Sequence, residues 1–101
     1  MEQSASGSLE RLYRVIAAVE DVEECRALFS DLCTVRELED MAQRLEAAFL
    51  LAGGRNYQEI SNSTGLSTAT ISRVSKALKA GSGYKKALEK LEEIEREEAG
   101  T

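Results

Sequence analysis

The chain has 101 residues, which is room for one domain, and it combines 43% apolar with 31% charged residues, as soluble globular proteins do. Proline and tryptophan are absent, and such a composition favours helices over sheets. Histidine is absent as well, which removes the commonest general base and the commonest metal ligand, so neither an enzyme nor a cofactor or metal site is expected.

The two cysteines, Cys25 and Cys33, lie within apolar periodic segments. We expect them to be buried thiols in a reducing compartment rather than metal or redox groups. No apolar run approaches membrane-spanning length, and the N-terminus lacks the basic and apolar regions of a signal peptide. The sequence therefore predicts a cytoplasmic protein with no membrane partner.

The net charge of −5 argues at first sight against a nucleic-acid partner, but the charge is unevenly distributed. Between Arg55 and Lys86 there are six basic residues and one acid, giving +5, whereas the remainder has seven basic and seventeen acidic residues, giving −10. An acidic protein with one basic segment can bind phosphate there while its other faces repel DNA.

Apolar residues at helical spacing predict three amphipathic helices before residue 54. Their expected starting signals are Ser8 for the first, Asp21 with Glu24 for the second, and a capping box of Thr34 and Glu37 for the third, which ends at Gly53-Gly54. Their apolar stripes are Leu9, Leu12, Tyr13, Ile16 and Val19; Val22, Cys25, Leu28, Phe29 and Leu32; and Val35, Leu38, Met41, Ala42, Leu45, Ala48 and Phe49.

Three further helices are predicted after residue 54. A capping box of Asn56 and Glu59 begins a short fourth helix, and Gly65 ends it. Ser67 caps a fifth helix through about Lys79, which the segment Gly81-Ser82-Gly83 terminates. The last helix carries the stripe Tyr84, Ala87, Leu88, Leu91 and Ile94, and its end from Glu92 to Glu98 is expected to fray. Six helices without strands predict an all-α fold.

Stripes this long on so short a chain can form an intersubunit core, an intramolecular core or both, and we favour a homodimer. The residues expected in the dimer core are Leu12, Ile16, Phe29, Leu38, Leu45 and Phe49. The expected organisation is a single domain, with dimerisation helices over 1–54, a DNA-reading head over 55–80, and a C-terminal helix and frayed tail over 81–101.

The segment from Tyr57 to Lys76 has the pattern of a helix-turn-helix. Ser61 is the small residue required where the second helix crosses the first, and Gly65 four positions later suits the turn. The expected apolar anchors are Ile60, Leu66, Ile71 and Val74. All these positions fit the motif at once, which makes the match stronger than any single dipeptide signal.

Short, polar or basic side chains are predicted on the outward face of the second helix of this motif, and residues 67–79 contain no acid. An ordinary solvated helix would be rich in Glu and Lys, whereas small side chains let a helix enter the major groove of DNA. The candidate DNA-binding residues are Gln58, Ser67, Thr68, Ala69, Ser72, Arg73, Lys76 and Lys79, with Thr70 and Ser75 flanking the face. Candidates for phosphate contacts are Arg55, Lys79, Lys85 and Lys86.

From Thr34 to Lys79 the chain resembles the Trp repressor superfamily, most nearly its Trp-repressor-related branch. The residues that carry the resemblance are Leu50-Leu51, Gly53, Gly65, Ala69-Thr70-Ile71-Ser72-Arg73, Ser75 and Leu78-Lys79. The resemblance implies an intertwined all-helical homodimer that recognises an operator through two symmetric reading heads. It also implies that Gln58, Thr68, Ala69 and Ser72 face the DNA.

The tryptophan corepressor of that family does not carry over as directly. Arg73 matches one family arginine that helps bind tryptophan, but Val74 stands where the family has a glycine that leaves room for the ligand. Ungapped counting places Gln43 at the second ligand arginine, with Arg44 one residue away. We therefore expect no small-molecule effector, and expect Val74 to pack against Leu45 or Phe49.

The sequence thus favours a transcriptional regulator, expected to be a repressor, that binds a two-fold symmetric operator in double-stranded DNA as a homodimer. The alternatives are a helical dimeric protein-interaction module with a vestigial reading head, or a corepressor-dependent amino-acid sensor. The basic segment argues against pure protein docking. Adjacent carboxylates such as Glu23-Glu24 and Glu92-Glu93 point to different sides of a helix and form no acid/base pair.

Overall fold

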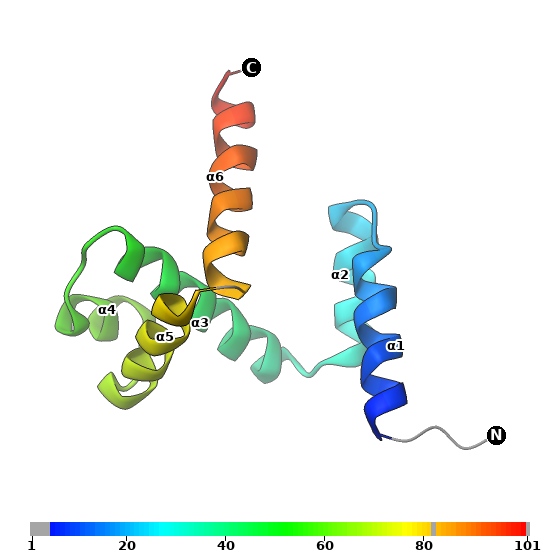
Figure 1. Ribbon diagram of the computed structural model, residues 1–101, viewed down its shortest axis with the longest axis horizontal. Coiled ribbons are helices and arrows are strands. Elements are labelled where there is room, and N and C mark those ends of the chain that lie inside the picture. Colours follow the sequence, from blue (N-terminus) through cyan, green and yellow to red (C-terminus); the bar gives the residue numbers. More distant parts are fainter. Residues whose placement is uncertain (1–4, 82, 101) are drawn as a thin grey trace. The chain divides into compact units, whose positions relative to one another are not determined.

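The computed structural model of the protein describes residues 5–81 and 83–100, and within these ranges every regular element is a helix. The helices are α1 (Ala5–Ala17), α2 (Val22–Leu32), α3 (Val35–Ala52), α4 (Tyr57–Thr64), α5 (Thr68–Ala80) and α6 (Gly83–Gly100), as Figure 1 shows. This confirms the prediction of six helices and an all-α fold. No helix in the described part of the chain is long and apolar enough to cross a membrane.

The chain divides into two units, residues 1–38 and residues 39–101. In the first unit, none of the side chains described from residue 7 onward is fully buried. Val22 and Val35 are 69% and 74% exposed, and Leu32 and Tyr13 are exposed as well. The free thiols Cys25 and Cys33 are only half-buried, so the expectation that both are buried is wrong for the single chain. The first unit therefore has apolar side chains but no core of its own.

Two of the three helix starts expected before residue 54 are confirmed. The Asp21 side chain accepts a hydrogen bond from the Glu24 N–H at 2.8 Å, and Thr34 and Glu37 form a reciprocal capping box. The expectation that Ser8 is an N-cap is wrong, because α1 already begins at Ala5 and Ser8 lies inside it. A serine cap contributes about 1 kcal/mol, which an additional helical turn can offset.

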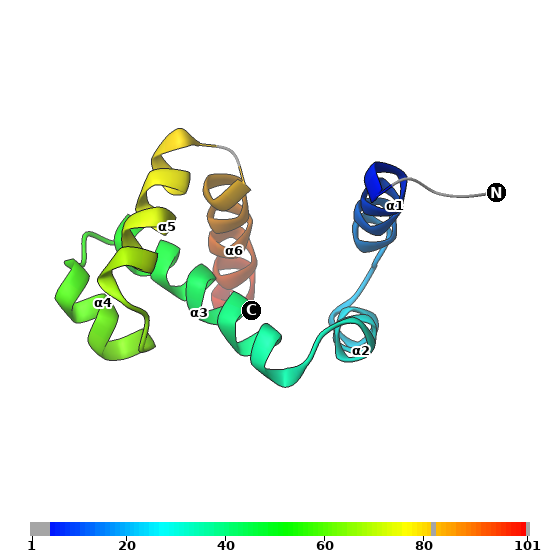
Figure 2. The ribbon, with the colours of Figure 1, turned by 90° about the horizontal axis from the view of Figure 1, so that it is seen from below.

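The core lies in the second unit, where α3, α4 and α5 meet (Figure 2). Ala47 and Ala48 of α3, Ile60 of α4, and Ile71 and Val74 of α5 are buried. Leu50, Leu51, Leu66, Tyr84 and Leu88 pack around them. Val74 therefore belongs to a closed cluster, whereas Leu45 and Phe49, the neighbours expected for it, stay 40% and 44% exposed.

The ends of the later helices follow the glycines. Gly54 and Gly81 have φ angles of +85° and +95°, which glycine adopts without strain, and the Gly81 N–H donates to the Ala77 carbonyl. Ser82, the middle of the expected terminator, lies outside the described residues. The last helix, α6, continues to Gly100, and an ion pair of 3.1 Å joins Arg96 to Glu92. The fraying expected from Glu92 to Glu98 stays a prediction.

Candidate nucleic-acid interface

The segment expected to be a helix-turn-helix consists of α4, the turn at residues 65–67, and α5. The Asn56 side chain accepts from the Glu59 N–H at 2.9 Å, and the Glu59 carboxylate accepts from the Asn56 N–H at 3.1 Å. Gly65 ends α4 with a φ of +80°, and Ser67 begins α5 by accepting from the Thr70 N–H at 3.2 Å. The capping signals predicted for both helices are confirmed.

The inner face of the motif is apolar and closed. Ile60 and Ile71 have no exposed surface, Val74 is 3% exposed, and Leu66 packs against them. This confirms the four anchors expected from the sequence. Because this side of α5 is fixed in the core, its opposite side faces solvent.

One face of α5 gathers most of the predicted DNA-binding residues. Four of these residues are spaced three or four positions apart and so lie in one row along the helix, namely Thr68, Ser72, Lys76 and Lys79. Ala69 lies beside this row. All are exposed except Ser72, which is half-buried. The N-cap Ser67 is exposed at the start of the row. This exposed row is acid-free and ends in two lysines.

Three predicted positions lie elsewhere. Gln58 is exposed on α4, where its amide donates to the Asn62 side chain at 3.1 Å. Arg73 lies on a neighbouring side of α5, three positions after Thr70, and lines the same cavity as Thr70. Ser75 was expected to flank the exposed face but is only 6% exposed, because it lies on the inward side one turn after Ile71.

Arg73 lines a cavity of about 360 Å³, which we call the arginine cavity. Its lining residues are Arg44, Thr70, Arg73, Val74, Ala77 and Tyr84. None of them is acidic, and neither arginine forms an ion pair within the described parts of the chain. Counting along the sequence pointed to Gln43 here, but the structure places Arg44 at the cavity. Val74 contributes to its wall from the core side.

The other basic residues of this unit are also accessible. Arg55 is exposed and lies 3.8 Å from the Glu59 carboxylate, and Lys85 and Lys86 are exposed in the first turn of α6. An exposed ion pair of this kind contributes little, so Arg55 can exchange Glu59 for a phosphate. Among the residues whose placement is described, no His/Cys/Asp/Glu group could hold a metal ion.

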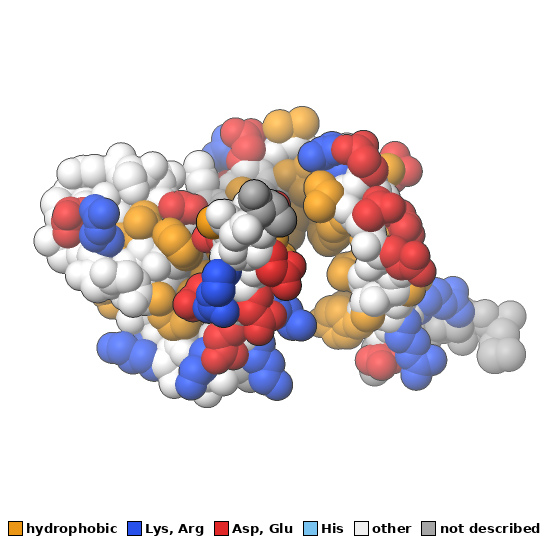
Figure 3. Space-filling view, turned by 90° about the horizontal axis from the view of Figure 1, so that it is seen from above, with side chains coloured by type: hydrophobic (Ala, Val, Ile, Leu, Met, Phe, Trp, Pro, Cys, Tyr) orange, Lys and Arg blue, Asp and Glu red, His pale blue; other side chains and the backbone are white. Residues whose placement is uncertain are grey.

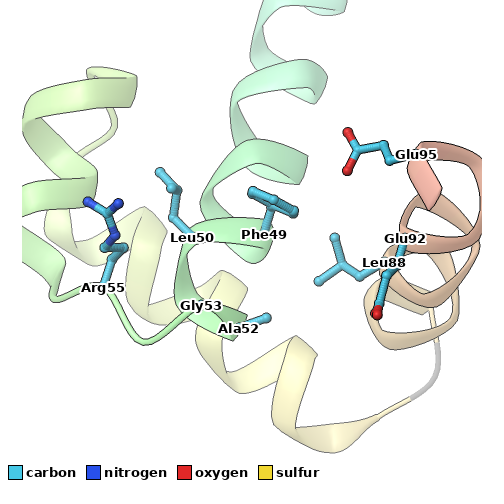
Figure 4. Close-up of a pocket in the computed structure, with 8 residues that line it drawn as sticks. All are labelled: Phe49, Leu50, Ala52, Gly53, Arg55, Leu88, Glu92 and Glu95. Carbon is cyan, nitrogen blue, oxygen red and sulfur yellow. The ribbon is translucent and has the colours of Figure 1, made fainter. Parts of the chain in front are cut away.

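The residues expected in a dimer core remain accessible in the single chain. Leu12, Ile16, Phe29 and Leu38 are half-buried, and Leu45 and Phe49 are exposed. Phe49 of α3 and Leu88 of α6 stand on opposite walls of a cavity of about 510 Å³, with Glu92 and Glu95 along α6 (Figure 4). Phe29 and Leu38 line a second depression in the first unit. Figure 3 shows such apolar patches among charged side chains on the surface.

Comparisons with known proteins agree with this geometry. Residues 7–92 match the family model of the Trp repressor protein. The Bacillus subtilis (strain 168) protein named Uncharacterized protein YerC is 46% identical over 90 residues, which cover 88% of this chain and 86% of that protein.

Two solved structures are similar along most of their length. The crystal structure of a TrpR like protein from Eubacterium eligens ATCC 27750 has 40% identity and a TM-score of 0.77, covering 83% of this chain and 88% of that one. A chain from Staphylococcus aureus has 38% identity and a TM-score of 0.77, covering 89% of each chain. With a family model spanning most of the sequence and relatives of this identity, the protein belongs to the Trp repressor family, whose fold is that of DNA-binding regulators and not of enzymes.

Proposed function

We propose that the protein is a sequence-specific transcriptional regulator, acting as a repressor, that binds a two-fold symmetric operator as a homodimer. The observation that carries the proposal is the exposed row of Thr68, Ser72, Lys76 and Lys79 on a helix whose other side is locked into the core. Small polar side chains at the start of such a helix can approach base edges in the major groove, and lysines farther along reach phosphates.

The roles divide by side-chain type. Thr68, Ala69 and Ser72 are assigned to base edges, since a hydroxyl can donate to or accept from a base and the Ala69 methyl suits a thymine methyl. Ser67 begins the row, Gln58 on α4 and Arg73 on another side of α5 are proposed as further DNA contacts, and Lys76 and Lys79 supply charge. Arg55, Lys85 and Lys86 are assigned to phosphates because they are exposed and lie outside the row.

The homodimer is proposed from the lack of a core in the first unit. Its two helices and the start of α3 present apolar side chains, yet none of those described there is buried. A short amphipathic helix gains most of its stability from covering its apolar face, so these faces need a partner surface. A second copy supplies such a surface and a second reading head, which gives the symmetry of the proposed operator.

The deciding experiment is duplex binding as a function of salt. Duplexes selected from a randomised pool should share a two-fold symmetric sequence, and their affinity should exceed that for mixed-sequence DNA by about a thousandfold or more. The logarithm of the binding constant should fall linearly with the logarithm of the salt concentration. Absence of any enriched sequence, with no salt-dependent binding, would instead favour a protein-interaction module.

A second candidate, a regulator controlled by an anionic small molecule, is favoured by the arginine cavity. Two arginines without an acid in the lining form a site of positive potential beside α5. The volume of about 360 Å³ lies at the small end of ligand sites, and Val74 takes up part of the wall. We propose that DNA binding needs no effector, and the first prediction below tests this.

A further inference from the structure

Leu66, in the turn between α4 and α5, has both of its backbone polar groups bound by hydroxyls of α4. The Ser61 hydroxyl donates to the Leu66 carbonyl oxygen at 2.8 Å, and the Leu66 N–H donates to Thr64 Oγ1 at 3.2 Å. The Thr64 hydroxyl in turn donates to the Ile60 carbonyl oxygen at 2.7 Å. Two hydrogen bonds therefore join the end of α4 to the residue directly before Ser67, the N-cap of α5, and the third holds the Thr64 hydroxyl against α4.

These bonds lie in a protected environment. Thr64 is only 8% exposed and Ser61 is half-buried, so water competes weakly for their hydroxyls. A protected backbone group left without its partner is costly, which favours the orientation of Leu66 that keeps both bonds. The Leu66 side chain packs against the core at the same time. Backbone and side chain together thus fix the direction in which the chain enters α5.

That direction decides where the exposed row of α5 lies. Ser72 lies four residues, or about 6 Å along the helix axis, after Thr68, so a rotation of about 10° at the start of α5 moves Ser72 by about 1 Å. Hydrogen bonds to base edges tolerate only a few tenths of an ångström. Long lysine side chains adapt to such shifts, whereas the short side chains of Thr68 and Ser72 do not.

We propose that Ser61 and Thr64 are positioning residues for sequence recognition, because their hydroxyls hold α5 at the angle at which its short side chains reach base edges. The inference rests on the proposed DNA-binding function and adds two residues that do not touch DNA. A purely stabilising role for these hydroxyls makes a different prediction, namely equal weakening on every DNA sequence.

The test compares Ser61→Ala and Thr64→Val with Ser63→Ala, an exposed hydroxyl on the same helix. Dissociation constants are measured for the duplex that the wild type selects from a randomised pool and for a mixed-sequence duplex at one salt concentration. We expect the ratio of the two constants to shrink about fivefold for Ser61→Ala and about tenfold for Thr64→Val, which loses two bonds. Affinity for mixed sequence should stay within about twofold, since phosphate contacts dominate it.

Two controls complete the design. Ser63→Ala should match the wild type, and Thr64→Ser, which keeps the hydroxyl, should recover most of the lost preference. Hydrogen exchange of the Leu66 amide should accelerate in Thr64→Val and stay unchanged in Ser63→Ala. If Thr64→Val does not fold, Ser61→Ala carries the test, because its site is only half-buried.

The outcomes separate the two proposals. A wild type that selects no sequence overturns the proposed function, and this inference with it. A wild type with a preferred sequence whose preference survives in Ser61→Ala and Thr64→Val overturns this inference alone. Equal weakening on selected and mixed duplexes also overturns it, because that is the behaviour of residues that only stabilise the turn.

Discussion

Arg44 of α3 and Arg73 of α5 line the same cavity, and no acidic side chain lines it with them. Two like charges at one opening repel each other unless water or an anion lies between them. Val74 lies directly after Arg73 and closes the core side of the cavity with a branched side chain. The cavity therefore combines the charge that an anion needs with a wall that restricts the size of any ring beside it.

Tryptophan is expected to change neither the melting temperature nor the DNA affinity of the wild type, because Val74 takes space that an indole needs. The measurement is thermal unfolding and duplex binding with and without the amino acid. A ligand specific for the native state at a hundred times its dissociation constant would add about 2.7 kcal/mol, which is easily detected. The Val74→Ala variant, in which the side chain is smaller, is compared with the wild type in the same two measurements. A shift in the wild type, with tighter operator binding, contradicts the prediction.

Ala69→Phe should weaken binding to the selected duplex far more than to mixed DNA, because a bulky side chain prevents close approach to base edges. Lys79→Ala should weaken both duplexes alike and reduce the salt slope by about 0.9, the value for one phosphate contact. Equilibrium titrations over a series of salt concentrations measure both quantities. The assignment fails if the two variants lose affinity in the same pattern.

Leu45→Glu and Phe49→Glu should abolish the dimer and unfold the protein together, since a charge in a shared core cannot be solvated and folding is coupled to association. Ala27→Glu places the same charge on an exposed position of α2 outside the apolar stripe, so it should remain folded. Sedimentation and far-ultraviolet circular dichroism at micromolar concentration report the two properties. A well-folded monomeric wild type would falsify the proposed assembly.

Gly65→Ala should lower the free energy of unfolding by about 1–2 kcal/mol, because an L-residue at a φ of +80° is strained. Apart from the two neighbouring residues in the chain, no residue has an atom within 4 Å of the added Cβ, so the loss reports backbone conformation and not a clash. Gly83→Ala, with equally open space at the start of α6 but no positive φ, should not destabilise. Urea unfolding of the three proteins makes the comparison, and equal stability of both variants would contradict it.

Hydrogen bonds from the backbone and side chain of Thr34 lower the pKa of Glu37 below its usual value of 4.5. A carboxyl with a lowered folded-state pKa stabilises the protein above its unfolded pKa, and this contribution is lost as the pH falls through the lower value. Glu37→Gln should therefore melt at a lower temperature than the wild type at neutral pH, and the two melting temperatures should converge in acid. Melting temperatures from pH 7 to pH 3 test this, and a constant difference would argue against it.

Local signals in the sequence were sufficient to predict α4, α5 and the turn between them. The caps at Asn56 and Ser67 and the turn at Gly65 depend on neighbours within a few residues, and the inward anchors follow from helical periodicity. The sequence predicted the start of α1 one turn too late. Ser8 is a favourable N-cap residue, but α1 already begins at Ala5.

The arginine cavity was partly missed for a different reason. Its lining comes from three helices, and counting along the chain gave Gln43 because a shift of one residue rotates a helical side chain by about 100°. The hydroxyl contacts of Ser61 and Thr64 were likewise hidden. The sequence identifies Ser61 only as a small residue. Its hydrogen bond to the Leu66 carbonyl depends on how the turn after α4 places Leu66.

The absence of a buried side chain among the described residues of 7–38 has a consequence for abundance. If these helices are covered only by a second copy, the folded form requires two chains to meet, and its amount at low expression scales with the square of the chain concentration. Halving synthesis would then leave about a quarter of the active protein in that regime. Control of its targets would respond steeply to its own production, without any cooperative step on the DNA.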